Sequence, residues 1–210
     1  MSDEYDNNKS YQAQSSEVLD GSAGSINPDM DYVRPAELPE QDLYHAHSFI
    51  EKWIFCQDAK VIGVQYFLTA VFTGIVGLIL SWLMRLQLGF PELAGFMTAE
   101  HYYQFVTMHG MIMVVYFLTA LFLGGFGNYL IPLMVGARDM VFPYVNMLSF
   151  WMFFVAVAVL MASFFVPGGP TGAGWTLYPP QTILEGTPGS GMGILLMLIS
   201  LSLFVIGFTM

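Results

Sequence analysis

The sequence predicts an all-α membrane protein, a polytopic helix bundle, and three observations support this fold class. Hydrophobic residues make up 55% of the 210 residues and charged residues only 10%, with a mean hydropathy of +0.58. Soluble domains average roughly 25% charged residues. The charges are also segregated, because 16 of the 22 Asp, Glu, Lys and Arg residues fall within the first 60 positions. The part that follows contains four apolar segments, each long enough to cross a bilayer.

The N-terminal part of the chain divides into two segments. Residues 1–42 form an acidic tail rich in Ser, Asp, Glu and Asn, which we predict to be disordered because it lacks enough apolar surface to bury. Residues 43–60 form an amphipathic segment with Phe49, Trp53 and Phe55 among charges. This pattern predicts a short helix lying at the membrane interface.

The membrane domain is predicted to occupy residues 61–210, with spans at about 61–84, 104–131, 144–166 and 191–210. Each span is close to the roughly 20 residues that cross the hydrocarbon core. The fourth span is still apolar at Met210, so we expect it to continue beyond this residue.

The distribution of charge predicts the orientation of the spans and excludes one class of partner. Lys52, Lys60 and Arg138 lie on one side of the membrane and Arg85 on the other, which favours a cytoplasmic N-terminus. The net charge of −10 argues against nucleic-acid binding. The acidic N-terminus matches neither a signal peptide nor a transit peptide, so we expect a bacterial cytoplasmic membrane.

The main candidate site is His109, which lies within 37 consecutive residues that carry no Asp, Glu, Lys or Arg. A histidine inside a membrane span indicates a functional site, and neutral imidazole is a haem-iron ligand. The alternative is a hydrogen bond to a neighbouring helix. If the first two spans are antiparallel, Arg85 lies at a similar depth and could contact a cofactor. Arg85 could also simply extend to the interface.

Polar residues on the opposite side of the membrane suggest a second site. Asp139 lies in a short loop, flanked by Asn128 near the end of the second span and Asn146 near the start of the third. A carboxylate at the mouth of two buried amides suits proton uptake through water. Alternatively, Asp139 pairs with Arg138, and the asparagines cap helix ends.

Several stretches of the chain resemble one family. They include Met-Arg-Leu-Gln-Leu at 84–88, Thr-Met-His-Gly-Met-Ile-Met at 107–113 and Gly-Trp-Thr-Leu-Tyr-Pro-Pro at 174–180. Longer matching stretches lie at 53–63 and 124–143. Together they resemble the N-terminal part of subunit I of haem-copper terminal oxidases, the cytochrome c oxidase family. The resemblance implies that the chain forms the first four transmembrane helices of a subunit with about twelve.

The resemblance implies roles for three residues around a low-spin haem of type a or b. His109 corresponds to an axial ligand of the haem iron. Arg85 corresponds to an arginine that contacts a haem substituent. Trp175, in the loop after the third span, corresponds to a tryptophan near the haem propionates; from the residues alone it is an interface aromatic or an N–H donor.

The resemblance also implies the reaction and the partners. Asp139 corresponds to the entrance of a proton pathway that Asn128 and Asn146 line. Electrons pass from cytochrome c, through a copper-bearing subunit II and the low-spin haem, to a second haem paired with copper. Dioxygen is reduced there to water and protons are pumped. The residues that hold this centre belong to later helices, so no catalytic residue is expected in this stretch.

The electron donor and the reaction class leave alternatives open. Quinol-oxidising members carry an arginine and an aspartate where this chain has Val76 and Leu80, which favours cytochrome c. His101 and Gln104 would nevertheless fit a quinol site, and quinol oxidases share the Gly-Ala-Arg-Asp form of the loop at 136–139. A haem-free proton-coupled transporter or a structural subunit would use the same helices without the redox chemistry.

Overall fold

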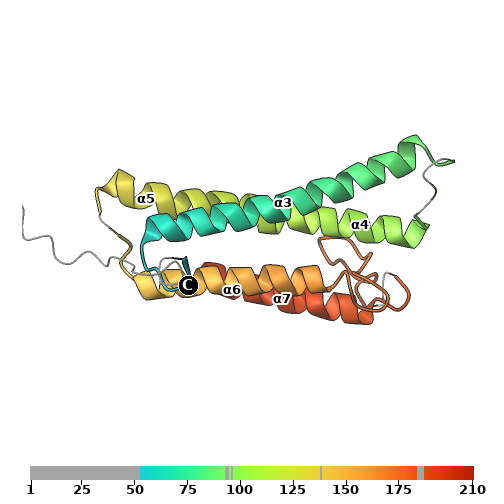
Figure 1. Ribbon diagram of the computed structural model, residues 1–210. Coiled ribbons are helices and arrows are strands. Elements are labelled where there is room, and N and C mark those ends of the chain that lie inside the picture. Colours follow the sequence, from blue (N-terminus) through green and yellow to red (C-terminus); the bar gives the residue numbers. More distant parts are fainter. Residues whose placement is uncertain (1–52, 93–94, 96, 138, 184–186) are drawn as a thin grey trace, which may run out of the picture. The chain divides into compact units, whose positions relative to one another are not determined.

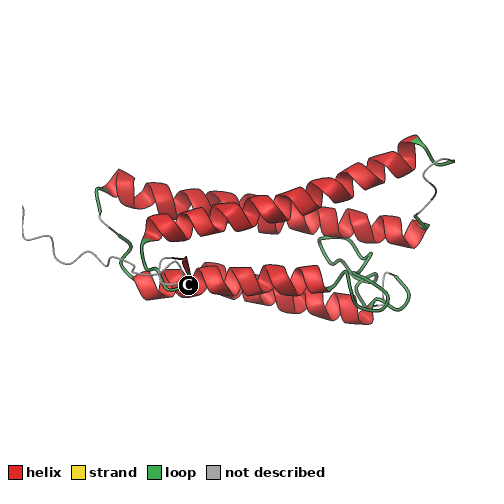
Figure 2. Cartoon of the chain, in the orientation of Figure 1, coloured by secondary structure: helices red, strands yellow, loops and turns green. Residues whose placement is uncertain are grey.

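The computed structural model describes residues 53–92, 95, 97–137, 139–183 and 187–210. All described residues belong to one compact unit, Ala46–Met210, so the prediction for residues 1–42 lies outside them. The described part contains helices and no strands (Figure 2). In chain order they are α3 (Ala59–Gly89), α4 (Ala99–Met111), η1 (Ile112–Gly127), α5 (Asn128–Val135), α6 (Pro143–Ala162) and α7 (Gly191–Thr209).

The predicted fold class is confirmed, because the described residues contain four helices long and apolar enough to cross a membrane. The second of these, Ala99–Val135, comprises α4, η1 and α5 without interruption. Its middle part η1 is π-helical, and the Thr119 hydroxyl donates to the carbonyl five residues earlier, that of Val114, at 3.1 Å. The third helix ends at Ala162, earlier than the predicted 166, because tight turns begin at Ser163 and lead into the Pro-Gly-rich loop.

Local signals fix the ends of these helices. Asp58 caps α3 by accepting from the Lys60 amide, and Thr98 caps α4 by accepting from the His101 amide. Pro143 begins α6, where its missing N–H costs nothing. Gly136 ends α5 with a left-handed φ of 73°, which glycine adopts without steric cost.

The predicted interfacial helix over 43–60 is wrong at its C-terminal end. Residues 43–52 lie outside the described part, whereas residues 54–58 form a turn followed by extended backbone, and Ala59 already belongs to α3. The physical reason is competition from tertiary hydrogen bonds. The carbonyl of Trp53 accepts from the Gln65 side chain, and the carbonyl of Ile54 accepts from the Trp151 indole at 3.0 Å.

The first two long helices form an antiparallel pair, with α3 packed along α4, η1 and α5 (Figure 1). Glycines permit the close approach. A Cβ on Gly63 would lie 3.0 Å from the Gly125 carbonyl oxygen, and one on Gly124 would lie 2.5 Å from the Tyr66 ring. Small residues at such crossings let helix backbones approach within membranes. We call the end where α3 begins the α5–α6 end, and the end where α3 finishes the α3–α4 end.

Gly63→Ala is expected to destabilise the bundle, because the added methyl meets backbone atoms that cannot rotate away. Overpacking of this kind costs about 1–3 kcal/mol. Gly125→Ala is the matched control, since its Cβ would find only ordinary contacts, the nearest at 3.5 Å. The measurement is the thermal unfolding midpoint of the detergent-purified complex. Equal midpoints for the two variants would contradict this account of the crossing.

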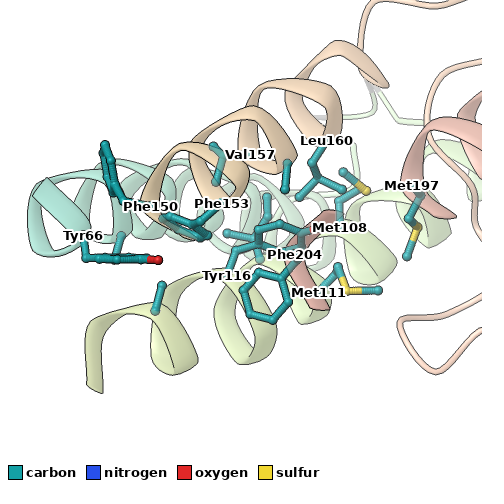
Figure 3. Packing of buried hydrophobic residues seen from close by; sticks show 14 of the residues in the cluster. Tyr66, Met108, Met111, Tyr116, Phe150, Phe153, Val157, Leu160, Met197 and Phe204 are labelled. Atoms are coloured by element: carbon teal, nitrogen blue, oxygen red, sulfur yellow. The ribbon is translucent and has the colours of Figure 1, made fainter. Parts of the chain in front are cut away.

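Helices α6 and α7 form a second antiparallel pair, and the two pairs share one core. Figure 3 shows Tyr66, Tyr116, Phe153 and Phe204 meeting between them. Two buried hydroxyl pairs join the helices across this core: Tyr66 with Ser149 at 2.9 Å and Tyr116 with Ser200 at 2.5 Å. Burying a hydroxyl without a partner is costly, so these pairs fix the register of the two helix pairs.

Candidate functional site

His109 lies in the last turn of α4 and its ring is already oriented by α3. Its Nδ1 lies 2.8 Å from the carbonyl oxygen of Gly77. Because a carbonyl only accepts, Nδ1 must carry the proton, and the neutral ring then presents Nε2 as a lone-pair donor. Among the described residues, Nε2 has no hydrogen bond. The neighbouring-helix bond that the sequence allowed is therefore present, and it leaves the ligating nitrogen available.

This arrangement fits an axial haem ligand. Metal-binding histidines usually donate their other ring N–H to a carbonyl or carboxylate, which fixes the tautomer and raises the basicity of the ligating nitrogen. Gly77 supplies that carbonyl, and its lack of a side chain leaves room for two residues of the second long helix. A Cβ there would lie 2.8 Å from the Met113 sulfur and 3.0 Å from an Ile112 methyl. The role of His109 as a haem ligand stays a prediction.

The expectation that Arg85 lies at the same depth as His109 is wrong. His109 lies level with Gly77, and Arg85 follows Gly77 by eight residues on α3. That separation corresponds to about 12 Å along a helix axis. The sequence could not give this offset, because the register between two helices depends on which glycines meet. Arg85 is exposed on the described part of the chain, and its extended side chain could bridge part of this separation.

Trp175 lies against the helix that carries His109. A Cβ on Gly110 would meet three atoms of the Trp175 side chain, the nearest, Cδ1, at 3.0 Å. The indole therefore packs on the backbone immediately after His109, while 46% of the residue stays exposed. Trp175 thus packs on the residue that follows His109, whereas Arg85 lies further along α3, and the shared haem site of these three residues stays a prediction.

Asp139 lies at the opposite, α5–α6 end and caps helix α3. Its Oδ1 accepts from the Ala59 amide at 3.1 Å and from the Met140 amide at 2.7 Å. A carboxylate at a helix N-terminus is favoured by the unpaired amides and the helix dipole. The alternative pairing with Arg138 falls on a residue outside the described part. Asp139 thus joins the α5–α6 loop to the start of α3.

Asn128 and Asn146 line the same cavity, which has a volume of about 410 Å³. Asn128 donates from Nδ2 to the Gly124 carbonyl at 2.8 Å, four residues earlier on the same helix. The alternative interpretation required the asparagine side chains to cap helix ends, but neither α5 nor α6 has a side-chain cap at its start. The Nδ2 of Asn146 is buried and has no hydrogen-bond partner among the described residues. Buried amides need partners, and a cavity of this size has room for water beside the Asn146 amide.

Sequence reasoning missed two polar residues of this cavity, Tyr66 and Ser149. Ser149 donates to the Asn146 carbonyl at 2.7 Å, and the Tyr66 hydroxyl therefore donates to Ser149 at 2.9 Å. Met140, next to Asp139, also lines the cavity. The sequence did contain a signal for these two residues, because a hydroxyl group inside an apolar span must find a hydrogen-bond partner when it is buried.

A second polar cavity, of about 370 Å³, lies at the α3–α4 end. Its lining includes His101 and Gln104 from α4 and Thr187 from the loop before α7. Gln104 is already committed to this loop, because its Nε2 donates to the Gly168 carbonyl at 2.7 Å. His101 and Gln104, which the sequence suggested for a quinol, thus line one cavity, although Gln104 already uses its amide group to bind the loop.

The fold is that of a multi-pass membrane protein, with a histidine hydrogen-bonded to a neighbouring helix toward one end and a cavity lined by two asparagines at the other. The family profile described as "Cytochrome C and Quinol oxidase polypeptide I" matches residues 61–210. The chain belongs to this family.

Known relatives give the same assignment. The chain is 70% identical over 178 residues to a protein from Bradyrhizobium diazoefficiens named "Alternative cytochrome c oxidase subunit 1", a match covering 85% of this chain and 30% of the relative. It is 41% identical over 161 residues to "Cytochrome c oxidase subunit 1" of Thermostichus vulcanus, covering 77% of this chain and 28% of that protein. The "Heme-copper oxidase subunit I+III" of Aeropyrum pernix is 40% identical over 147 residues, covering 70% and 18%. The chain thus spans less than a third of the length of these relatives.

Proposed function

We propose that the chain contributes the first four membrane helices of a terminal oxidase catalytic subunit in a bacterial cytoplasmic membrane, with its N-terminus cytoplasmic. The complete subunit, with a copper-bearing subunit II, passes electrons from cytochrome c through a low-spin haem to a haem-copper centre. Dioxygen is reduced there to water and protons are pumped. The observation that carries this proposal is the Nδ1 hydrogen bond of His109 to Gly77 in a chain of this family.

The residues at the α3–α4 end would hold and shield the low-spin haem, of type a or b. A bound haem supplies reversible one-electron transfer. His109 presents Nε2, and the Gly77 carbonyl keeps the ring in one orientation and one tautomer. Trp175 covers the adjacent backbone, which limits water access on that side. Arg85 lies further along α3, where its guanidinium would favour negative charge on a haem substituent within reach of its extended side chain and so would raise the haem potential.

The residues at the α5–α6 end would take up protons. Asp139 offers a carboxylate at the loop, and the next residue, Met140, lines the cavity of Asn128 and Asn146. The unpaired Nδ2 of Asn146 supports the presence of ordered water. The hydroxyl groups of Ser149 and Tyr66 continue from Asn146 into the bundle, which gives protons a route away from the loop.

Reduced cytochrome c is the expected electron donor. The position where quinol-oxidising members carry an aspartate is Leu80, which is only 6% exposed and packs in the apolar core. An apolar core at that point offers a quinol hydroxyl no hydrogen-bond partner. We expect the complex to consume oxygen faster with reduced cytochrome c than with ubiquinol, because a missing polar contact of about 1.4 kcal/mol would weaken quinol binding roughly tenfold. Faster turnover with ubiquinol would favour a quinol site in the cavity of His101 and Gln104.

The optical spectrum of the purified complex tests the function as a whole. We expect a low-spin haem band in the reduced-minus-oxidised spectrum, and the pyridine haemochrome identifies the haem type. A colourless complex would contradict the proposal. It would favour a proton-coupled transporter, or a structural subunit if proton movement were also absent.

A further inference from the structure

The loop between α6 and α7 is anchored along one face of α4. Gln104, Thr107 and Gly110 are spaced by three residues, so they lie on the same side of this helix. Each contacts the loop: Gln104 donates to the Gly168 carbonyl at 2.7 Å, Thr107 accepts from the Gly174 amide at 2.9 Å, and Gly110 receives the Trp175 indole. The last of these contacts lies next to His109.

Thr107 is the middle one of these three contacts, and its hydroxyl both donates and accepts a hydrogen bond. The residue is 1% exposed. The hydroxyl donates to the Tyr103 carbonyl at 2.9 Å and accepts from the Gly174 amide at 2.9 Å. Gly174 has a φ of 88°, a conformation that side-chain-bearing residues rarely adopt, and it directly precedes Trp175. The hydrogen bond therefore fixes the residue that sets the direction of the indole.

We propose that Thr107 is a positioning residue for the His109 site. Its hydroxyl holds the Gly174 amide and so keeps the Trp175 side chain against Gly110, where it covers the backbone beside His109. This inference rests on the proposed function, because its consequence is a fixed environment for the low-spin haem. Without the hydroxyl, the Gly174 amide loses its acceptor, and the indole is free to move and admit water. A more polar environment changes the haem potential.

The test compares three variants in the assembled complex. Thr107→Val keeps the size and shape of the side chain but removes the hydroxyl, whereas Thr107→Ser keeps the hydroxyl. Thr119→Val is the matched control, because the Thr119 hydroxyl donates within its own helix to Val114. Two properties are measured: amide hydrogen exchange of the peptide that contains Gly174 and Trp175, and the band position and midpoint potential of the low-spin haem.

We expect Thr107→Val to accelerate exchange at Gly174 about tenfold, the factor that loss of a typical hydrogen bond gives. The haem band and potential should shift in the same variant. In Thr107→Ser, exchange at Gly174 and the haem properties should stay close to those of the wild type. Thr119→Val should change neither. Thr107→Ala, which removes the hydroxyl without adding bulk, repeats the test if the valine variant does not assemble.

Unchanged exchange at Gly174 in Thr107→Val would overturn the proposal. Faster exchange with an unaltered haem would also overturn it, because the threonine would then anchor the loop without positioning anything for the haem. If the wild-type complex holds no haem, the proposed function fails. The exchange measurement on Gly174 would then still decide whether Thr107 fixes the loop, so the two failures are distinguishable.

Discussion

His109→Ala is expected to abolish the low-spin haem band in the reduced-minus-oxidised spectrum of the assembled complex. Alanine offers iron no ligand, and the Gly77 carbonyl loses its donor. Oxygen consumption should fall to background, because the route for electrons into the complex is gone. The measurement is the optical spectrum with haem content per complex. A wild-type spectrum in this variant would contradict the assignment of the ligand.

His101→Ala provides the matched control for this prediction. His101 lies on the same helix, eight residues earlier, and its Nδ1 is 3.0 Å from the Thr98 hydroxyl. It has no contact with the Gly77 carbonyl. The low-spin band should therefore persist in His101→Ala. Loss of the band in both variants would indicate a general failure of assembly.

Asp139→Asn is expected to slow proton uptake by roughly 10²-fold, the range that a positioned proton-transfer group contributes. The haem content should stay normal, because Asp139 lies at the opposite end of the bundle from His109. The amide oxygen of asparagine still accepts from the Ala59 and Met140 amides, so the cap on α3 should survive. The measurement is proton release by the complex in reconstituted vesicles, with electron transfer recorded in parallel.

Asp58→Asn separates proton transfer from helix capping. Asp58 also caps α3, through the Lys60 amide at 2.9 Å, but it does not line the cavity of Asn128 and Asn146. Pumping should be normal in this variant. Asp139→Ala, which removes the cap as well, should additionally lower stability by about 0.5–2 kcal/mol. Undiminished pumping by Asp139→Asn would show that the cap is the whole role of Asp139.

The sequence was sufficient for the helices because hydropathy alone marks a membrane span. It also singled out His109, since an imidazole in an apolar stretch needs a specific reason to be there. The depth of Arg85 could not be predicted, because it depends on the register set by contacts such as those of Gly63 and Gly77. The cap by Asp139 was missed for a similar reason, since it joins residues that are 80 positions apart.

The cavity of Asn128 and Asn146 shows the same limit. Asn128 and Asn146 were recognisable as amides near span ends, and the structure places both in one cavity. Tyr66 and Ser149 come from helices that are not adjacent along the chain, so no local pattern links them. The end of the predicted surface helix failed because the Trp53 and Ile54 carbonyls bind partners on α3 and α6 instead of continuing a helix.

High-resolution cryo-electron microscopy density around His109 in the complete complex tests most directly whether this imidazole holds a haem. We expect a porphyrin whose iron is bonded to Nε2, with Nδ1 still on the Gly77 carbonyl and the Trp175 indole against Gly110. An imidazole surrounded only by side chains of a neighbouring helix, with no macrocycle in reach, would contradict this expectation.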